Sequence, residues 1–184
     1  KINSGICFMS VDCSKIKMLI SDVDGVWTDG TFYKGTEGME FKRFTVLDGV
    51  GTAMARAADL KIALISGRYS PATEYRAKEL KIDDVYNGNL NKLPSYEDLK
   101  SKYGFDDSEI AYIGDDLIDI PVMEKVAVPI AVANAVPEVK AIAKYTTKVS
   151  GGYGAFREAV AWIIEEKGET EAVMQKMKER VQNS

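Results

Sequence analysis

The sequence predicts an α/β fold: a single doubly wound, mostly parallel, Rossmann-like sheet with a β-hairpin inserted after the first strand. Short apolar runs alternate along the chain with amphipathic segments of helix length, which is typical of βαβ units. Several of these runs stop at a small or acidic residue close to a glycine, as buried parallel strands do where they leave a sheet. No repeat or low-complexity tract interrupts the 184 residues, so we expect one domain.

The start of the chain differs from the rest. Residues 1–14 are expected to form an irregular leader, and the domain is placed at residues 15–184, C-terminal helices included. Cys7 and Cys13 both lie in the leader and could be free thiols on a flexible arm. Two cysteines do not make a disulfide framework, which favours a cytoplasmic location.

Composition and charge exclude some partners. The formal net charge is −4, whereas a nucleic-acid-binding surface needs a basic excess. No apolar run approaches the roughly 18–20 residues that span a bilayer, and no signal-peptide pattern is present. We therefore expect neither nucleic acid nor a membrane as a partner.

The elements follow in order from periodicity and turn residues. Met-Leu-Ile at residues 18–20 predicts the first strand, and alternating apolar residues around the glycine-bearing turn 34–38 predict a hairpin beside its end. Further strands are expected at residues 61–65, 85–86, 109–113, 129–133 and 146–149. Helices are expected at residues 48–58, 71–80, 94–102, 118–126, 137–144, after the flexible glycine loop 151–154, and at 169–182.

Helix faces and caps can also be predicted. Ser70 is expected to cap the helix that begins with Pro71. The first and last helices should bury the following apolar residues: Val50, Met54, Ala57 and Ala58, then Val173, Met177 and Val181.

Asp22 and Asp24 directly follow the first strand, and no basic residue lies in that stretch. Two carboxylates this close repel each other unless a cation or a shared proton intervenes. The chain contains no histidine, so Mg²⁺, which prefers oxygen ligands, is the expected cation. The alternative is an ordinary loop-capping pair, since Asp and Gly are common turn residues.

Later strand ends add further polar groups, namely Ser66, Lys92 and the Asp115-Asp116 pair. The carboxyl ends of parallel strands meet at one edge of the sheet, where ligands bind. There, one carboxylate could act as a nucleophile on a phosphate, a second could transfer protons, and Ser66 and Lys92 could bind the phosphate oxygens. Taken singly, Ser66 could be a turn residue, Lys92 a solvated one and Asp115-Asp116 a helix cap.

These motifs resemble a known family. Residues 22–25 (DVDG), 66–68 (SGR), Lys92 and 114–119 (GDDLID) resemble the four motifs of the haloacid dehalogenase-like (HAD) phosphatases. Residues 22–30, 48–51, 66–71, 114–121 and 151–158 together are similar to the cap-less 3-deoxy-D-manno-octulosonate 8-phosphate (KDO 8-phosphate) phosphatase family. The resemblance covers about residues 15–167.

The resemblance implies roles for the site residues. It makes Asp22 the nucleophile and Asp24 the general acid and base, with Mg²⁺ bound by the Asp22 side chain, the Asp24 backbone carbonyl and the Asp115 side chain. It implies phosphate binding by Ser66, Gly67 and Lys92. The remaining implied residues support the metal site from behind (Asp116 and Asp119) or bind substrate (Asp48, Arg68, Arg76 and Arg157).

The implied protein is a cytoplasmic homotetramer of lipopolysaccharide biosynthesis that hydrolyses a sugar-acid phosphate. Its hairpins would form a barrel, and residues 151–158 would pack toward a neighbour's site. Arg76 alone remains of a run of arginines common in the family, and Leu47 stands where an arginine is common, so a nine-carbon sialic-type 9-phosphate stays an alternative substrate. Arg68 favours the eight-carbon substrate, KDO 8-phosphate. A different class, a non-catalytic receiver-like or regulatory α/β domain, is disfavoured because Lys92 precedes the second acidic pair.

Overall fold

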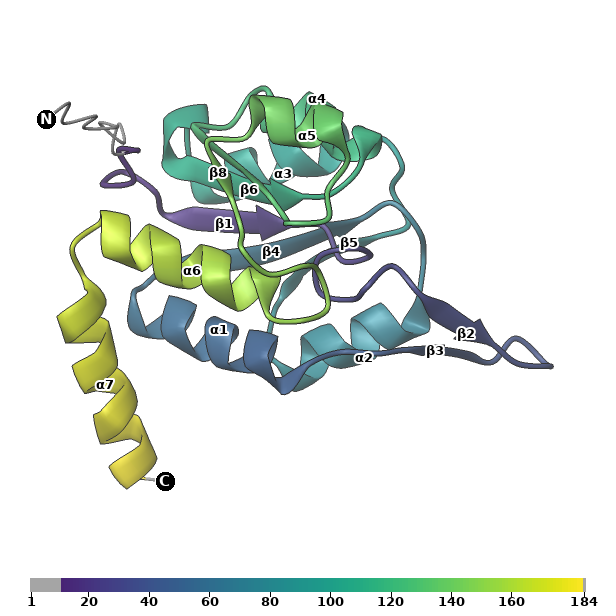
Figure 1. Ribbon diagram of the computed structural model, residues 1–184, viewed down its shortest axis with the longest axis horizontal. Coiled ribbons are helices and arrows are strands. Elements are labelled where there is room, and N and C mark those ends of the chain that lie inside the picture. The colour runs from purple at the N-terminus through teal and green to yellow at the C-terminus, as the bar shows by residue number, and fades with distance from the viewer. Residues whose placement is uncertain (1–10, 184) are drawn as a thin grey trace, which may run out of the picture.

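A computed structural model describes residues 11–183 of the protein, which form a six-stranded sheet in the order β5-β4-β1-β6-β7-β8 with every neighbouring pair parallel (Figure 1). The strands of this sheet are β1 (Met18–Ser21), β4 (Lys61–Ser66), β5 (Asp84–Asn87), β6 (Ile110–Gly114), β7 (Val128–Ala131) and β8 (Tyr145–Thr146). The predicted doubly wound, mostly parallel sheet is confirmed.

Helices cover both faces of the sheet. One face carries α1 (Val46–Ala57), α2 (Pro71–Glu79) and α6 (Ala155–Glu166), and the other carries α3 (Leu93–Tyr103), α4 (Ile120–Met123) and α5 (Pro137–Ile142) (Figure 1). Helix α7 (Thr170–Gln182) packs on α1 and α6. Two short 3₁₀ turns, η1 (Asp107–Glu109) and η2 (Leu117–Asp119), flank β6.

Strand β1 lies at the centre of the sheet and is buried along its whole length. It pairs with β4 on one side and with β6 on the other, so the strand order reverses between β1 and β6. In doubly wound sheets the ligand crevice lies beyond the strand ends at this point of reversal. The site is therefore expected where Asp22 follows β1 and Asp115 follows β6.

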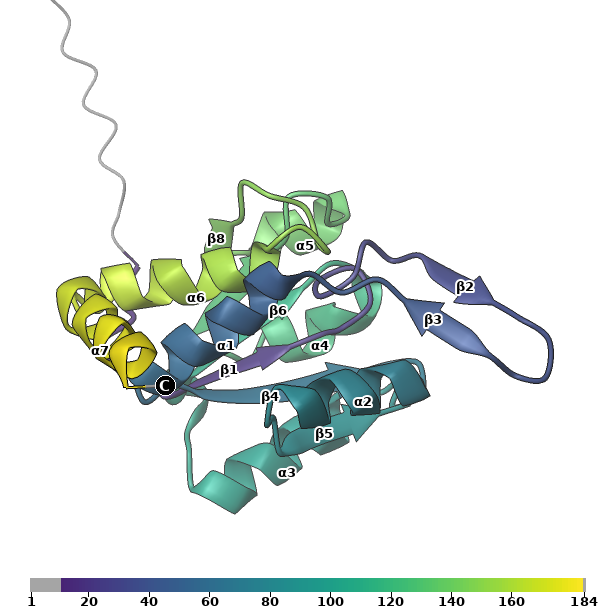
Figure 2. The same cartoon turned by 90° about the horizontal axis from the view of Figure 1, so that it is seen from below.

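The predicted hairpin consists of β2 (Phe32–Lys34) and β3 (Glu40–Lys42), and it projects beyond the carboxyl edge of the sheet (Figure 2). Tyr33 and Phe41 are paired, and each is 62% exposed. Successive side chains of a strand point to opposite faces. The flanking residues Glu40 and Lys42 therefore point the other way, toward the domain.

Helix α1 buries only part of the predicted face. Ala58 is buried and Met54 and Ala57 pack against the core as predicted, but Val50 is exposed. The buried residues within the helix are Asp48, Gly51, Thr52 and Ala55. The reason is a close approach of α6, since a Cβ atom on Gly51 would lie 2.8 Å from the Cα atom of Arg157. Small residues, not large apolar ones, allow two helices to come this near.

Other predicted boundaries also need correction. Residues 118–126 form the η2 turn and the short helix α4, because Asp116 and Asp119 make a capping box that sets a 3₁₀ turn there. Strand β8 begins at Tyr145, whose ring stacks on Trp162 at 4.3 Å, one residue earlier than expected. In α7, Val173 is buried as predicted, but Val181 is 74% exposed.

The described end of the leader is packed on the domain. Cys13 is fully buried in the core, so the expectation of a flexible arm is wrong for this residue; Cys7 lies outside the described residues. Among residues 11–183, no helix is long and apolar enough to cross a membrane.

Candidate active site

A cavity of about 280 Å³ opens at the carboxyl edge of the sheet, between the strand ends and the hairpin. It is lined by seven residues predicted for the site: Asp22, Asp24, Ser66, Gly67, Arg68, Asp115 and Asp116. Gly30, Phe32, Leu90 and Ile118 complete the wall. The structure therefore brings together most of the predicted residues.

Asp22 continues the line of β1, and its backbone N–H donates to the Ile113 carbonyl at 3.0 Å. Its carboxylate oxygen Oδ1 accepts from the Val23 N–H at 2.7 Å and lies 2.9 Å from the Lys92 Nζ. Burial and the charge of Asp119 raise the pKa of Asp22 above its usual range, against the opposing charge of Lys92. Two contacts to Oδ1 thus hold the Asp22 side chain at the cavity wall.

Lys92 sits behind Asp22, and its side chain is fully buried. Its Nζ donates to Asp119 Oδ1 at 2.6 Å and to the Tyr112 hydroxyl at 3.2 Å. Burial alone would lower the pKa of Lys92, but Asp22 and Asp119 outweigh it and raise the pKa, so the lysine is charged. Lys92 does not line the cavity wall, and its contact with phosphate stays a prediction.

Asp119 organises the site from behind, and all its partners are donors. Besides Lys92, the Tyr112 hydroxyl donates to Oδ1 at 2.6 Å, and the backbone N–H groups of Asp115 and Asp116 donate to Oδ2 at 2.9 and 3.2 Å. Asp119 belongs to a group of carboxylates close enough to share a metal. Because both its oxygens are already occupied, it fits the predicted supporting role better than that of a ligand.

Asp22 and Asp115 fit a divalent cation. Their ligand atoms and one of Asp119 lie within 4.8 Å of one another. Asp115 Oδ1 is buried, and within the described part of the chain it has no hydrogen-bond partner. Burial, then Asp22 and Asp119, raise the pKa of Asp115 to about 8, as expected for crowded carboxylates without a cation. Gly25 permits this crowding, because a Cβ atom there would lie 1.9 Å from Asp115 Oδ2.

Magnesium should therefore stabilise the fold as well as support activity. At a concentration of one hundred times its Kd, Mg²⁺ is expected to add about 2.7 kcal/mol and raise Tm by roughly 5–10 °C. Thermal unfolding with Mg²⁺ and with EDTA measures this shift. Asp115→Asn should lose the shift, while Asp59→Asn, a change at an exposed carboxylate, should keep it. An equal shift in both variants would contradict the site.

Ser66 and Gly67 form the predicted phosphate-binding turn after β4. Ser66 is buried, and its hydroxyl donates to the Arg68 carbonyl at 2.9 Å. A Cβ atom on Gly67 would lie 2.8 Å from Ile118 Cδ1, so a larger residue here would displace the Ile118 side chain in the cavity wall. Phosphate binding by these two residues stays a prediction.

Arg68 lines the cavity but is not free in it. Its Nη1 donates to Glu40 Oε1 at 3.0 Å, and its Nη2 donates to Glu40 Oε2. The Ser70 hydroxyl also donates to Glu40, at 2.7 Å, instead of capping α2 as predicted. The Arg68 guanidinium holds the pKa of Glu40 well below its usual range, so this pair is fully ionised.

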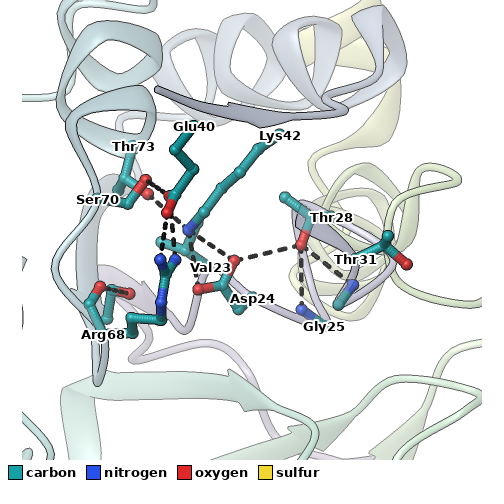
Figure 3. A network of polar contacts seen from close by, with 12 residues as sticks. Val23, Asp24, Gly25, Thr28, Thr31, Glu40, Lys42, Arg68, Ser70 and Thr73 are labelled. Carbon is teal, nitrogen blue, oxygen red and sulfur yellow. Dashed lines mark hydrogen bonds and ion pairs between the residues drawn. The ribbon is translucent and has the colours of Figure 1, made fainter. Parts of the chain in front are cut away.

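Asp24 is held from the hairpin. Lys42 Nζ lies 2.7 Å from Asp24 Oδ1 and 2.8 Å from Oδ2, and Thr28 Oγ1 lies 3.5 Å from Oδ1 (Figure 3). The charge of Asp24, for which the local sequence offers no partner, is thus compensated by a residue eighteen positions later.

Three predicted substrate-binding residues lie outside the cavity wall. The Asp48 carboxylate is buried between α1 and α6 and accepts from the Arg157 N–H at 3.1 Å. Burial raises the pKa of Asp48 to about 6. Arg76 donates to the Thr45 carbonyl at 3.1 Å and to Glu79. A single chain does not bring Asp48, Arg76 and Arg157 to the cavity wall. Their roles in substrate binding therefore stay predictions.

The glycine loop at residues 151–154 is packed, not flexible as predicted. The Gly152 N–H donates to the Val26 carbonyl at 2.9 Å. A Cβ atom on Gly151 would lie 1.6 Å from the Gly25 carbonyl oxygen. The loop therefore supports the chain's own Asp22–Gly30 turn from outside.

Sequence reasoning missed Glu40, Lys42 and Tyr112. Tyr112 lies in a buried strand, where the sequence indicates an ordinary core residue. Only the structure shows that its hydroxyl accepts from Lys92 and donates to Asp119. For Glu40 and Lys42 the signal was available. They are oppositely charged, alternate with Phe41 in a strand beside the site, and therefore share one face of it.

Known proteins share this architecture. The family model described as haloacid dehalogenase-like hydrolase matches residues 62–154. The 3-deoxy-D-manno-octulosonate 8-phosphate phosphatase of Escherichia coli strain K12 is 44% identical over 149 residues, which cover 81% of this chain and 79% of that protein. The phosphatase of the same name from Yersinia pestis is 42% identical over 151 residues, which cover 82% and 81%.

Solved structures of such phosphatases are similar to this protein as well. The crystal structure of that phosphatase from Yersinia pestis has a TM-score of 0.85 and 39% identity, and the match covers 90% of this chain and 89% of that one. The phosphatase from Moraxella catarrhalis, solved in complex with a magnesium ion, a phosphate ion and a KDO molecule, has a TM-score of 0.86 and 34% identity, with 90% and 95% covered.

A parallel sheet that brings an acidic cluster, a buried lysine and a serine to its carboxyl edge is suited to metal-dependent phosphoryl transfer. The similarity to the relatives extends over most of both chains. The chain belongs to the haloacid dehalogenase-like hydrolases, and within them to the 3-deoxy-D-manno-octulosonate 8-phosphate phosphatase family. This membership confirms the resemblance predicted from the motifs and leaves the receiver-like alternative without support.

Proposed function

We propose that the protein hydrolyses KDO 8-phosphate to KDO and phosphate through an aspartyl-phosphate on Asp22. The observation that supports this most strongly is the position of Asp22 in the cavity wall, between the charged Lys92 and the unpartnered Oδ1 of Asp115. An anionic nucleophile can approach an anionic phosphate only where cations offset the repulsion. Lys92 supplies one cation, and Asp115 completes the site for another.

The reaction takes two steps. An Asp22 carboxylate oxygen attacks phosphorus, the ester P–O bond breaks, and Asp24 gives its proton to the departing sugar oxygen. Asp24 then takes a proton from water, whose oxygen attacks phosphorus and breaks its bond to Asp22. Phosphate leaves, and both aspartates return to their starting states. Mg²⁺ bound by Asp22, Asp115 and the Asp24 carbonyl would neutralise phosphate charge.

The rest of the cavity suits a sugar acid. Ser66 and Gly67 lie in the wall where phosphate oxygens need donors, and Phe32, Leu90 and Ile118 offer apolar surface to the carbon chain. Arg68 offers two parallel donors, the geometry that binds a carboxylate in bidentate fashion. Its partner Glu40 would have to be displaced or shared, so the carboxylate of the substrate competes with the hairpin.

Replacing Arg68 tests this selectivity. Arg68→Ala is expected to raise KM for the sugar-acid phosphate about tenfold or more, because a charge-assisted bidentate contact is lost. KM for p-nitrophenyl phosphate, which has no carboxylate, should change little. Steady-state phosphate release on both substrates measures the difference, with Arg43→Ala, an arginine paired with Asp29 outside the cavity wall, as the matched control. Equal increases of KM on both substrates would remove the assigned role.

The proposed activity itself is tested with a panel of phosphate esters, assayed with Mg²⁺ and with EDTA. The panel contains KDO 8-phosphate, nine-carbon sugar-acid 9-phosphates and hexose phosphates. Metal-dependent preference for KDO 8-phosphate supports the proposal. Preference for a nine-carbon compound would keep the chemistry and replace the substrate, and absence of phosphate release from every compound would overturn the function.

We also propose a cytoplasmic homotetramer acting in lipopolysaccharide biosynthesis, as the sequence resemblance implies. The exposed outer face of the hairpin supports an assembly, since Tyr33, Met39 and Phe41 are each at least half exposed. Exposed apolar residues gathered on one small element are typical of contact surfaces between chains.

A further inference from the structure

Lys42 is an unusual hairpin residue, because its side chain is completely buried. Burying an ammonium group is costly unless every donor finds an acceptor. Its Nζ contacts both carboxylate oxygens of Asp24, at 2.7 and 2.8 Å, and donates to the Thr73 hydroxyl at 3.3 Å (Figure 3). Lys34, on the partner strand of the same hairpin, is 59% exposed.

Lys42 reaches Asp24 from outside the cavity. Asp24 lines the cavity wall and Lys42 does not, so the ammonium group has no direct access to a bound substrate. Its acceptors in this structure belong to Asp24 and to Thr73 of α2, itself a buried residue. Any effect of Lys42 on the reaction is therefore expected to pass through Asp24.

The hairpin is fixed where it offers this lysine. Two residues earlier on β3, Glu40 accepts from Arg68 and from the Ser70 hydroxyl, so the same strand face is attached twice to the domain (Figure 3). Phe41 between them points outward and is 62% exposed. A long, flexible lysine side chain held at both its backbone and its ammonium group gives Asp24 a rigid neighbour.

We propose that Lys42 is a positioning residue. Its ammonium group donates to one oxygen of the protonated Asp24 carboxyl, which turns the proton on the other oxygen toward the leaving sugar oxygen, and once that proton has left it contacts both carboxylate oxygens, as in this structure. The inference rests on the proposed function, in which Asp24 is the proton donor. Proton transfer needs the donor within hydrogen-bond reach of the leaving oxygen, and a carboxyl free to rotate spends little time there. Thr28, at 3.5 Å from Asp24, is too distant to fix it alone.

Two substrates with different leaving groups show whether Lys42 positions the general acid Asp24 or only anchors the hairpin. An alkyl phosphate needs a proton on its departing oxygen, whereas p-nitrophenol leaves readily as an anion. For Lys42→Met we expect kcat/KM to fall about 10²-fold on KDO 8-phosphate, the usual contribution of a general acid, and to change much less on p-nitrophenyl phosphate. The ratio of the two values does not depend on how much of the variant is folded, because both substrates report on the same active molecules.

Arg43→Met is the matched control, since Arg43 directly follows Lys42 at the base of the hairpin and pairs with Asp29 outside the cavity wall, without contacting Asp24 or Glu40. Its ratio should equal that of the wild type. An unchanged ratio in Lys42→Met, or an equal fall of the ratio in both variants, would show that the hairpin acts only as a whole, and would overturn the proposal. Should Lys42→Met yield no folded protein, Thr73→Val, which removes one acceptor of the ammonium group, decides instead: a smaller fall in the ratio supports the proposal, and no change overturns it.

Failure of the proposed function would look different. A wild-type protein that releases phosphate from neither substrate in Mg²⁺ would overturn the hydrolase activity itself. A wild-type protein that hydrolyses both, with an unaltered ratio in the variants, would overturn only the role of Lys42.

Discussion

Asp22→Asn should abolish phosphate release, with kcat falling by about 10⁴-fold or more, while the fold remains intact. An amide is nearly isosteric with the carboxylate but is a poor nucleophile. The amide oxygen can still accept from the Val23 N–H, which holds Oδ1 in the wild type at 2.7 Å. Phosphate release and circular dichroism of the same preparation measure the two halves of this prediction.

A matched substitution in the same turn isolates the effect. Asp29→Asn changes a partly exposed aspartate that pairs with Arg43 and does not line the cavity, so its kcat should stay close to that of the wild type. Turnover retained by Asp22→Asn would exclude Asp22 as the nucleophile. A loss of turnover accompanied by unfolding would be uninformative for the mechanism, so thermal unfolding of both variants is part of the measurement.

Lys92→Met should be among the most destabilising single substitutions in the chain. It removes the ammonium group that lies between Asp22 and Asp119 and leaves two buried carboxylates without their cation. Breaking a buried pair from one side typically costs about 3–5 kcal/mol. Urea unfolding measures the loss, and Lys176→Met is the control, because that lysine is 55% exposed and its partner Asp59 is 89% exposed.

The cause of the Lys92→Met effect can be checked in the same experiment. If the unpaired carboxylate is responsible, Lys92→Met combined with Asp119→Asn should be less destabilised than the sum of the two single variants. An exposed pair such as Lys176–Asp59 contributes about 0–1 kcal/mol, so the control should lose little. Equal losses in Lys92→Met and Lys176→Met would contradict the role of Lys92 as the buried cation of the site.

The sequence was sufficient to predict the sheet and most of the cavity wall. Asp22, Ser66 and Asp115 each follow an apolar strand, and parallel strands bring their carboxyl ends to one edge whatever the details of packing. Residues that end different parallel strands therefore lie close together in the fold, although they are far apart in the sequence. The Mg²⁺ requirement followed from the same residues, because crowded carboxylates in a chain without histidine favour an oxygen-binding cation.

What the sequence could not provide were contacts set by tertiary packing. Alternation predicts that β3 has two faces, but which of them turns toward the domain depends on where the hairpin docks, so Glu40 and Lys42 were missed. The burial of Asp48 is a second such contact, and its role in substrate binding stays a prediction. The close approach of α6 at Gly51 buries it between two helices, and no periodicity in α1 shows that approach.

The proposed mechanism depends on a covalent phosphate on Asp22, and chemical trapping detects this intermediate directly. Protein mixed with KDO 8-phosphate and Mg²⁺ is quenched with borohydride, which reduces an aspartyl-phosphate to homoserine, and is then mapped by peptide mass spectrometry. We expect homoserine at residue 22 in the wild type and none there when EDTA replaces Mg²⁺. Phosphate release at the normal rate with homoserine at another aspartate, or with none at any position, would contradict the proposed mechanism.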